Sequence, residues 1–268
     1  MTTATPFLSH IYNSIHKRNK NFIGVCVGRT GSGKSWSMLS LCETLDPTFT
    51  IDRCVFDFFQ LRDLVASKKL ECGSFILWDE AQVGVSSRES QSELNKETNK
   101  IASTFRNRNY GLIFTCPGLG MIDKWLRELT HYIFEPLDID YKTNRSLISL
   151  DKMDYNAKLD KIYKYPPTIT VDDEQIKITS LWVPIPSLKL RTAYENHKNK
   201  FQDNLYVETE DKISDEILAN PAEYLKHYDS SKKKKLDRYK LETTFKFKNQ
   251  KQLWRIKNKV EAALNARH

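Results

Sequence analysis

Short apolar runs alternate with longer segments of helix-forming composition over the first half of the chain. A run that is continuous rather than alternating is typical of a strand buried on both faces, and residues 74–78 are the clearest example. Strands are predicted at residues 21–27, 51–58, 74–78, 112–115 and 132–134, and helices at 34–45, 61–66 and 86–103 and around Trp125. Strands that alternate with helices form right-handed βαβ units. The pattern therefore predicts an α/β fold with a mostly parallel sheet.

The pattern changes after Pro136, where shorter strand-like segments are separated by turns rich in Asn, Asp and Pro. These strands are predicted at residues 146–150, 161–165, 168–171 and 176–183. They indicate an antiparallel hairpin extension of the sheet over roughly residues 137–185. Two charged helices are predicted after it, at 188–201 and 215–228, joined by a polar connection.

A glycine-rich segment lies between the first predicted strand and the first predicted helix. It matches the phosphate-loop (Walker A) pattern G-x-x-x-x-G-K-[ST] at every constrained position. Its backbone amides can fold around a phosphate, and the helix N-terminus adds partial positive charge. Lys34 is expected to reach the β- and γ-phosphates of ATP, and the Ser35 hydroxyl to bind Mg²⁺. The predicted nucleotide-binding residues of the loop are Gly28, Arg29, Thr30, Gly31, Ser32, Gly33, Lys34 and Ser35.

Two acidic residues, Asp79 and Glu80, follow the buried run at 74–78 in the position of a Walker B motif. An ATPase with this type of loop needs an acid at the end of a neighbouring strand to hold Mg²⁺, and Asp79 has that position. Glu80 is expected to act as the catalytic base that polarises the attacking water, which favours hydrolysis over phosphate transfer to a small molecule. The alternative is that the two acids cap a helix after the strand.

Three arginines and a threonine are further candidates for the catalytic site. ATP hydrolysis in this class often uses an arginine from a neighbouring subunit to neutralise charge on the γ-phosphate. Arg106 and Arg108, before the strand at 112–115, and Arg127, after it, are candidates for this role or else ordinary surface residues. Thr115, at the end of its strand, has a suitable position to sense the γ-phosphate.

The composition is that of a globular protein. Of 268 residues, 28% are charged and 40% hydrophobic, which excludes the disordered, collagen-like and coiled-coil classes. No apolar run approaches the roughly 18 residues of a membrane span, and residues 1–20 lack the apolar core of a signal peptide. The five cysteines form no C-x-x-C pair, so neither a disulfide framework nor a zinc site is expected. We therefore expect a cytoplasmic protein with no membrane partner.

Positive charge is concentrated at the C-terminal end of the chain. The net charge is +8, and residues 228–268 contain 13 Lys and Arg against four acids. A near-neutral body with a basic tail is expected of a protein that binds a polyanion at one end. The alternative is a solvated tail that only improves solubility.

A small helical module is predicted within this basic region, with helices at 236–244 and 250–264 around a tight turn. Leu253, Ile256 and Val260 share one face of the second helix. This arrangement is typical of a helix-turn-helix that binds duplex DNA, and also of a plain helical hairpin. The candidate DNA contacts on the opposite face are Lys251, Arg255, Asn258 and Lys259. The predicted parts of the chain are a P-loop domain at 1–205, a helical linker with a lysine run at 206–235 and the helix-turn-helix-like module at 236–268.

Several motifs together resemble the FtsK/HerA superfamily of P-loop ATPases, and within it the Zot-like ATP-binding proteins of archaeal viruses and mobile elements. The motifs are residues 28–35, 76–81, 104–117 and 122–127, and the resemblance covers about residues 20–200. It implies an oligomeric ring, expected to be a hexamer, that hydrolyses ATP with Mg²⁺ and acts on DNA. It also implies that Glu80 is the base and that an arginine finger acts across the subunit interface.

Three functions are compatible with these features. The first is a DNA-dependent ATPase that moves, packages or remodels a viral or plasmid genome, in the host cytoplasm if the protein is viral. The second is an ATP-switched DNA-binding regulatory protein, and the third is a motor for virion assembly or extrusion. DNA-stimulated ATP turnover separates the first function from the second.

Overall fold

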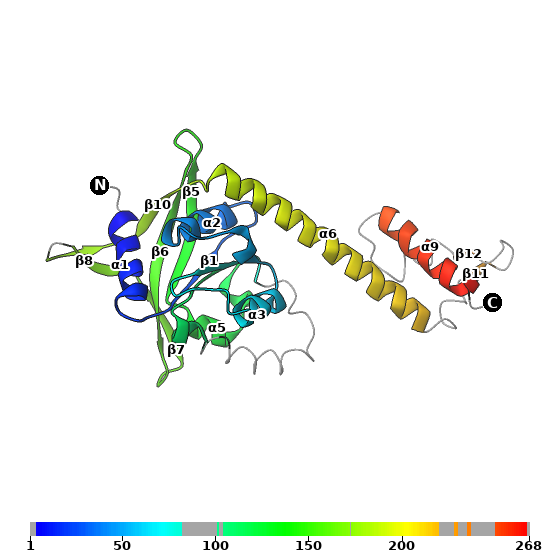
Figure 1. The fold of residues 1–268 in the computed structure, drawn as a ribbon, viewed down its shortest axis with the longest axis horizontal. Coiled ribbons are helices and arrows are strands. Elements are labelled where there is room, and N and C mark those ends of the chain that lie inside the picture. The colour runs from blue at the N-terminus through cyan, green and yellow to red at the C-terminus, as the bar shows by residue number, and fades with distance from the viewer. Residues whose placement is uncertain are drawn as a thin grey trace. The chain divides into compact units, whose positions relative to one another are not determined.

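A mixed sheet of eight strands is the framework of the N-terminal part of the chain in the computed structural model (Figure 1). The structure describes residues 4–81, 101, 104–171, 173–219, 228–229, 235–236 and 250–266. Contacts between residues divide the chain into two units, Met1–Asn196 and His197–His268. The sheet, its covering helices and both predicted ATP-binding motifs belong to the first unit.

One half of the sheet is parallel, with the strand order β5–β1–β4–β3–β2. In this half, β1 (Phe22–Val27) pairs with β4 (Gly111–Cys116) and β5 (Tyr132–Asp140). On the other side of β4 lies β3 (Phe75–Trp78), which also pairs with β2 (Cys54–Val55). Because β4 separates two parallel neighbours, the carboxyl ends of β1, β4 and β3 meet at one edge of the sheet. The prediction of an α/β fold with a mostly parallel sheet is confirmed.

An antiparallel extension continues the sheet beyond β5. Its strands are β6 (Arg145–Asn156), which pairs with β5, and β7 (Lys161–Tyr165) and β10 (Ser180–Pro184), which both pair with β6. A separate hairpin consists of β8 (Thr168–Val171) and β9 (Glu174–Lys177). The predicted antiparallel extension is confirmed. The single strand predicted at 176–183 is divided between β9 and β10, because the amide of Ile178 between them donates to the carbonyl of Pro167 (2.9 Å).

Helices α1 (Ala4–His16) and α2 (Lys34–Leu45) cover one face of the sheet (Figure 1). The ring of Phe7 meets the rings of Tyr132 and Phe134 edge to face, with centroids 5.3 and 6.4 Å apart. Aromatic pairs of this geometry stabilise packing beyond the apolar area that they bury. The sequence analysis missed α1, although its buried residues have helical spacing; they are Phe7, Ile11 and Ile15.

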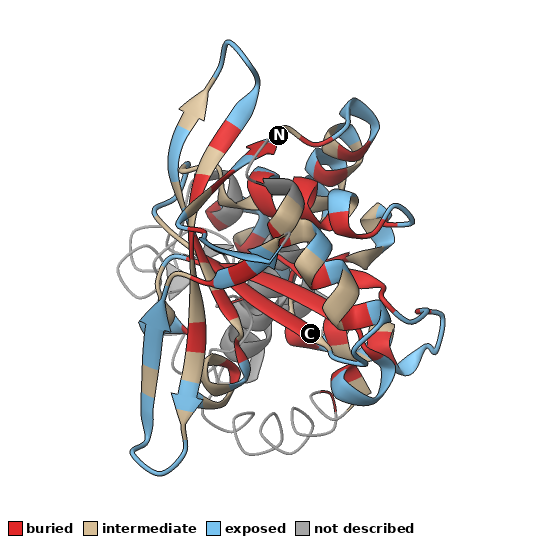
Figure 2. Cartoon of the chain, turned by 90° about the vertical axis from the view of Figure 1, so that its left-hand side faces the viewer, coloured by how far each residue is buried: buried red, intermediate tan, exposed pale blue. Residues whose placement is uncertain are grey.

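The opposite face of the sheet packs on α3 (Phe58–Ala66), on α5 (Lys124–Leu129) and on a helical segment at 104–108. Every residue of β3 and β4 is buried, and Figure 2 shows these central strands in red. Burial on both faces explains why their sequences are continuous apolar runs. The helix predicted at 86–103 lies outside the described residues except for Ile101, which is helical and buried.

The strand predicted at 51–58 is wrong over most of its length. Only Cys54–Val55 forms a strand, and Ile51–Arg53 before it is a single 3₁₀ turn. The helix that follows begins at Phe58 because Asp57 caps it, its side chain accepting a hydrogen bond from the amide of Gln60 (2.8 Å). A local cap of this kind outweighs the β propensity of the aromatic residues that follow it.

A single helix, α6 (Leu188–Ala219), runs through the helix predicted at 188–201, the connection after it and the first five residues of the helix predicted at 215–228. Residues 220–227 of that second prediction lie outside the described residues. No Gly or Pro occurs between 201 and 215, so nothing in the sequence ends the helix there. The last residue of the second predicted helix, Tyr228, is described and lies in a short strand rather than a helix. Within the described ranges, no helix is both long and apolar enough to cross a bilayer.

The described part of the second unit includes a short hairpin and a helix. β11 (Tyr228–Asp229) pairs antiparallel with β12 (Lys235–Leu236), and α9 (Gln250–Ala266) follows. The second helix of the predicted basic module is confirmed as α9. The first, predicted at 236–244, lies outside the described residues except for Leu236, which is a strand residue. The helix-turn-helix therefore stays a prediction.

His131 is a half-buried hydrogen-bond acceptor beside β1. Its Nδ1 accepts from the amide of Ile23 (3.0 Å), and its own amide donates to the Ile23 carbonyl oxygen (2.8 Å). Burial, with a smaller contribution from the positive charge of Lys152, lowers the pKa of His131 to about 4. In the unfolded chain a histidine binds a proton near pH 6.5. The unfolded state is therefore favoured progressively as the pH falls from 6.5 towards 4.

We expect His131 alone to remove about 2 kcal/mol of folding free energy when the pH is lowered from 7.5 to 5. His131→Asn retains an acceptor near the position of Nδ1 but has no proton to gain, so its stability should depend less on pH by this amount. Urea unfolding of both proteins at the two pH values gives the difference, in which the contributions of the other groups cancel. An equal pH dependence in the two proteins would show that another group is responsible.

Candidate active site

The segment between β1 and α2 forms a tight loop with backbone conformations that favour glycine. Gly28, Gly31 and Gly33 have φ angles of 147°, 81° and 88°. Residues with a side chain rarely adopt such conformations. A Cβ at Gly33 would also lie 3.1 Å from Cδ1 of Ile139 on β5, so the loop packs closely on the sheet. The exposed residues of this loop are Arg29, Thr30 and Gly31.

Lys34 is folded back over the loop. Its Nζ donates hydrogen bonds to the carbonyl oxygens of Gly28 (2.8 Å) and Arg29 (2.9 Å). The hydroxyl of Ser32 in the same loop is buried and, within the described part of the chain, has no hydrogen-bond partner. A buried polar atom without a partner is unusual in a folded protein, and it is expected where a ligand supplies the missing bond. The ammonium and the unsatisfied hydroxyl together fit a phosphate group.

Ser35 and Asp79 connect the loop to the end of β3. The Ser35 hydroxyl donates a hydrogen bond of 2.8 Å to Oδ1 of Asp79, which is completely buried. A buried carboxylate is unfavourable unless hydrogen bonds or a cation compensate its charge. A hydroxyl and a carboxylate are oxygen ligands of the kind that Mg²⁺ prefers, and Mg²⁺ usually takes its remaining ligands from water and substrate phosphates. This pair of residues therefore fits a magnesium ion that accompanies a nucleotide.

Thr115 is hydrogen-bonded to both acidic residues and is completely buried. Its hydroxyl donates to Oδ1 of Asp79 (2.7 Å), and the oxygen of this hydroxyl accepts from the amide of Glu80 (2.9 Å). Both contacts follow from the strand order, because β4 carries Thr115 between β1 and β3. Thr115 therefore supports both acids. Its contact with the γ-phosphate stays a prediction.

The backbone of Glu80 is in the left-handed region, with a φ of 56°. For a residue other than glycine, such a conformation costs on the order of 1–3 kcal/mol and occurs mostly where neighbouring groups enforce it at functional sites. The hydrogen bond from its amide to Thr115 is one such restraint. The side chain of Glu80 is half-buried. Strain at this residue agrees with the predicted role of its carboxylate as the base.

The three candidate arginines occupy different environments. Arg106 and Arg108 are exposed on the helical segment at 104–108, whereas Arg127 on α5 is half-buried. The Nε atom of Arg127 is buried with no hydrogen-bond partner among the described residues. Within the same residues, no hydrogen bond or ion pair joins any of the three to the phosphate loop. An arginine finger therefore stays a prediction that concerns a neighbouring subunit.

Tyr194 is a residue of the site that the sequence analysis missed. It lies on α6, is 1% exposed, and its hydroxyl donates to Oδ2 of Asp79 (2.6 Å). Burial and then the negative charge of Asp79 raise the pKa of Tyr194 far above its usual value, so the phenol stays protonated and remains a donor. The available signal was the apolar pair Leu190 and Tyr194, four residues apart in an otherwise charged helix. Such a pair predicts packing but not the partner.

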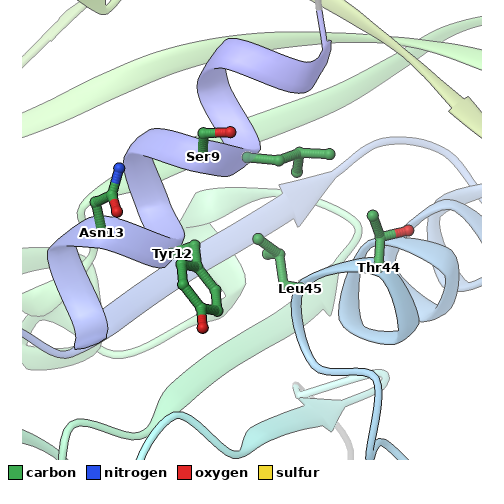
Figure 3. Close-up of a pocket in the computed structure, with 6 residues that line it drawn as sticks. Ser9, Tyr12, Asn13, Thr44 and Leu45 are labelled. Carbon is green, nitrogen blue, oxygen red and sulfur yellow. The ribbon is translucent and has the colours of Figure 1, made fainter. Parts of the chain in front are cut away.

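A separate pocket of about 270 Å³ lies between α1 and α2 (Figure 3). Its lining residues are Leu8, Ser9, Tyr12, Asn13, Thr44 and Leu45. Thr44 lies near the C-terminal end of α2, roughly 15 Å from Lys34 at 1.5 Å per residue. The pocket is therefore distinct from the phosphate loop, which lies at the opposite end of α2.

No protein-family model matches the chain, and no curated protein matches its sequence. Solved structures that are similar include the N-terminal domain of zonular occludens toxin from Neisseria meningitidis, with 18% identity and a TM-score of 0.31. That match covers 55% of this chain and 94% of the toxin domain.

Two further similar structures are named as nucleotide-hydrolysing enzymes. The genome-packaging NTPase B204 of Sulfolobus turreted icosahedral virus 2, in complex with ATP-γS, has 14% identity, a TM-score of 0.34 and coverage of 55% of this chain and 97% of its own. EssC (ATPases 2 and 3) from Geobacillus thermodenitrificans has 13% identity and a TM-score of 0.33, with 69% of this chain and 45% of its own covered.

Proposed function

We propose that this chain is a magnesium-dependent ATP hydrolase of the P-loop class. The observation that carries the proposal is the hydrogen bond of 2.8 Å from the Ser35 hydroxyl to Oδ1 of Asp79. It joins the end of the phosphate loop to a carboxylate that directly follows β3 of the same sheet. An enzyme that binds Mg²⁺ together with ATP brings these two groups together in this way.

Each group of the site has a role that follows from its chemistry. The loop amides and Lys34 bind and orient the phosphates, and Ser35 and Asp79 would hold Mg²⁺, which when bound supplies positive charge against the phosphates. The carboxylate of Glu80 accepts a proton from the attacking water as the γ-phosphate is cleaved. Glu80 has no evident use in a kinase that transfers phosphate to a small molecule, so hydrolysis is the reaction that uses every group. The products are ADP and inorganic phosphate.

The proposed biological task is to move, package or remodel a viral or plasmid genome in the cytoplasm, as a ring, expected to be a hexamer. The motif resemblance supports this proposal, and so do the 13 Lys and Arg in residues 228–268. In the described part of this region, α9 buries Leu253 and Val260 and exposes Arg255 and Lys259. Side chains of Lys and Arg that neutralise DNA phosphates provide most of the affinity of non-specific DNA binding.

An arginine finger acting in trans would link catalysis to the proposed ring. Arg106 and Arg108 lie on the helical segment before β4 and Arg127 on α5 after it, and in this proposal one of them reaches the ATP of the neighbouring subunit. An arginine supplied across an interface can raise the rate of cleavage by several orders of magnitude. Hydrolysis would then depend on assembly as well as on nucleotide binding.

The test of the proposed function is ATP turnover by the full chain with and without duplex and single-stranded DNA, together with its mass in the presence of nucleotide. Magnesium-dependent turnover, stimulation by DNA and a ring-sized mass are expected. Turnover that DNA does not change, with tight binding to one DNA sequence, would instead support the ATP-switched regulatory protein. Absence of magnesium-dependent turnover and of nucleotide binding would contradict the proposal.

Charge reversal on α9 should weaken DNA binding while basal ATP turnover is retained. In the double variant Arg255→Glu with Lys259→Glu, the slope of log affinity against log salt concentration should become shallower by about 2, since each phosphate contact contributes about 0.9. Leu253 and Ile256 on the buried face are unchanged, so the helix should fold. Fluorescence anisotropy with labelled duplex at several salt concentrations measures the slope.

The matched control reverses a charge on the exposed Lys142 of the first unit, which should leave the slope unchanged. If the α9 variant binds DNA as tightly as the original chain at every salt concentration, α9 makes no phosphate contacts. The basic region would then be a solvated tail, and the ATPase ring itself would have to bind the DNA.

A further inference from the structure

The carboxylate of Asp79 is held on both of its oxygen atoms, by groups from different parts of the fold. Oδ1 accepts hydrogen bonds from Ser35 on α2 and Thr115 on β4, at 2.8 and 2.7 Å. Oδ2 accepts from Tyr194 on α6, at 2.6 Å. The first two donors belong to the strands and loop of the nucleotide site, whereas the third comes from a helix outside them. The orientation of Asp79 therefore depends on the position of α6.

The first turns of α6 are attached to α2 next to the phosphate loop. Trp36, which directly follows Ser35, donates a hydrogen bond from Nε1 to Oε1 of Glu195 (3.0 Å). The guanidinium of Arg191 lies 5.4 Å from the centre of the Trp36 ring. Arg191 and Glu195 are four residues apart and therefore on the same side of α6. Just before the helix, the amide of Ser187 donates to the carboxylate of Glu43 on α2 (2.9 Å). These contacts fix the start of α6 in the position from which the hydroxyl of Tyr194 reaches Asp79.

We propose that Tyr194 is a positioning residue for Asp79. Through Tyr194, the attachment of α6 to α2 favours the binding of a magnesium–nucleotide complex, and this binding in turn favours the attachment. The proposal rests on the proposed function and adds α6 to the site. If the attached helix improves magnesium binding, then magnesium–nucleotide must stabilise the attached helix by the same factor, since coupling between two equilibria is reciprocal. Tyr194 itself contacts the carboxylate of Asp79.

The direction of the effect follows from what the phenol hydroxyl restrains. Without it, Oδ2 loses the hydrogen bond from Tyr194 at a completely buried position, and the carboxylate is free to turn. In the metal-free protein, the flexible hydroxyl of Ser35 can follow such a turn. With magnesium bound, both oxygen ligands must keep one arrangement, because Mg²⁺ demands near-ideal octahedral geometry. The loss of the hydroxyl therefore costs more in the magnesium-bound state.

The test compares Tyr194→Phe with Tyr110→Phe in the full chain. Both tyrosines are buried and each donates one hydrogen bond, but Tyr110 bonds to the carbonyl of Leu70 (3.0 Å), away from the site. Binding of a fluorescent ADP analogue is titrated with Mg²⁺, so the readout is independent of turnover. In Tyr194→Phe the half-saturating magnesium concentration should rise about tenfold, which corresponds to a hydrogen bond to a charged group. Affinity for the analogue without magnesium should change less than twofold, and Tyr110→Phe should match the original chain in both.

Amide hydrogen exchange of residues 188–196 is the second measurement. These amides of the original chain should exchange more slowly when magnesium and ADP are added. In Tyr194→Phe this slowing should be absent. A second variant, Arg191→Ala, tests the same inference if Tyr194→Phe does not fold. It removes the contact of Arg191 with Trp36 and leaves the hydrogen bonds to Asp79 in place. This variant should raise the half-saturating magnesium concentration about twofold to threefold, as expected for the loss of one cation–π contact.

The outcomes separate this inference from the proposed function. If the original chain binds no ADP analogue in the presence of magnesium, both are overturned. Suppose instead that magnesium promotes binding of the analogue to the original chain, and that Tyr194→Phe and Arg191→Ala both have its half-saturating magnesium concentration. Only the inference is then overturned. Tyr194 would then be a packing residue, and the ATPase proposal would stand.

Discussion

ATP turnover should fall at least about a hundredfold when Lys34 is replaced by alanine, the scale of loss found when a preorganised donor to a developing charge is removed. Its ammonium lies within the loop, 2.8 and 2.9 Å from two loop carbonyls, where it can bind the β- and γ-phosphates. Alanine leaves the negative charge of these phosphates without this cation. Steady-state release of phosphate and the affinity for a fluorescent ATP analogue measure the effect.

The control for Lys34→Ala is Lys142→Ala, which removes an exposed lysine from the same unit and should be silent. Thermal unfolding of both variants shows whether the protein is folded, because Lys34 also provides two hydrogen bonds to the loop. A folded Lys34→Ala protein with unchanged ATP affinity and rate would show that residues 28–35 do not bind the nucleotide.

Cleavage should slow by about 10²- to 10⁴-fold in Glu80→Gln, while ATP remains bound. The amide side chain of glutamine is similar in size but cannot accept the proton of the attacking water. The amide of residue 80 can still donate to Thr115, and Ser35, Thr115 and Tyr194 can still donate to Asp79. Single-turnover hydrolysis with saturating enzyme measures the chemical step, and the ATP analogue measures binding.

Asp79→Asn separates the roles of the two acids. Asparagine is similar in size to aspartate, and the hydroxyls of Ser35, Thr115 and Tyr194 that donate to Asp79 can also accept from an amide group. The variant should therefore fold but lose magnesium-dependent nucleotide binding, because the negative charge that would hold Mg²⁺ is removed, whereas Glu80→Gln should keep this binding. Glu71→Gln, at an exposed position, is the control for a loss of negative charge. A milder effect of Asp79→Asn than of Glu80→Gln on turnover would mean that the two roles are assigned wrongly.

The parallel core was predictable because its strands leave a strong local signal. β3 and β4 are buried at every residue, and their apolar runs mark them almost to the residue. The ends of other elements depended on interactions that the hydrophobic pattern does not contain. The Asp57 cap begins α3 where a strand was expected, and α6 continues through a polar segment in which no residue stops a helix. Composition alone did not distinguish a polar helix from a polar connection.

The sequence by itself determined the phosphate loop and the neighbouring acids. The loop depends on glycines and a lysine within eight consecutive residues, and Asp79 and Glu80 follow a run that is unmistakably a buried strand. Chemistry of this kind is encoded locally, because the backbone of one short segment supplies most of the binding groups. These residues could be assigned before the fold was known.

Only the tertiary structure decided which other residues complete the site. Thr115 and Tyr194 reach Asp79 across 36 and 115 positions of sequence. The first contact exists because β4 lies between β1 and β3, and the second because the start of α6 packs beside Trp36. Strand order and helix attachment are set by the packing of the whole unit, and a threonine in a strand or a tyrosine in a charged helix carries no local sign of it.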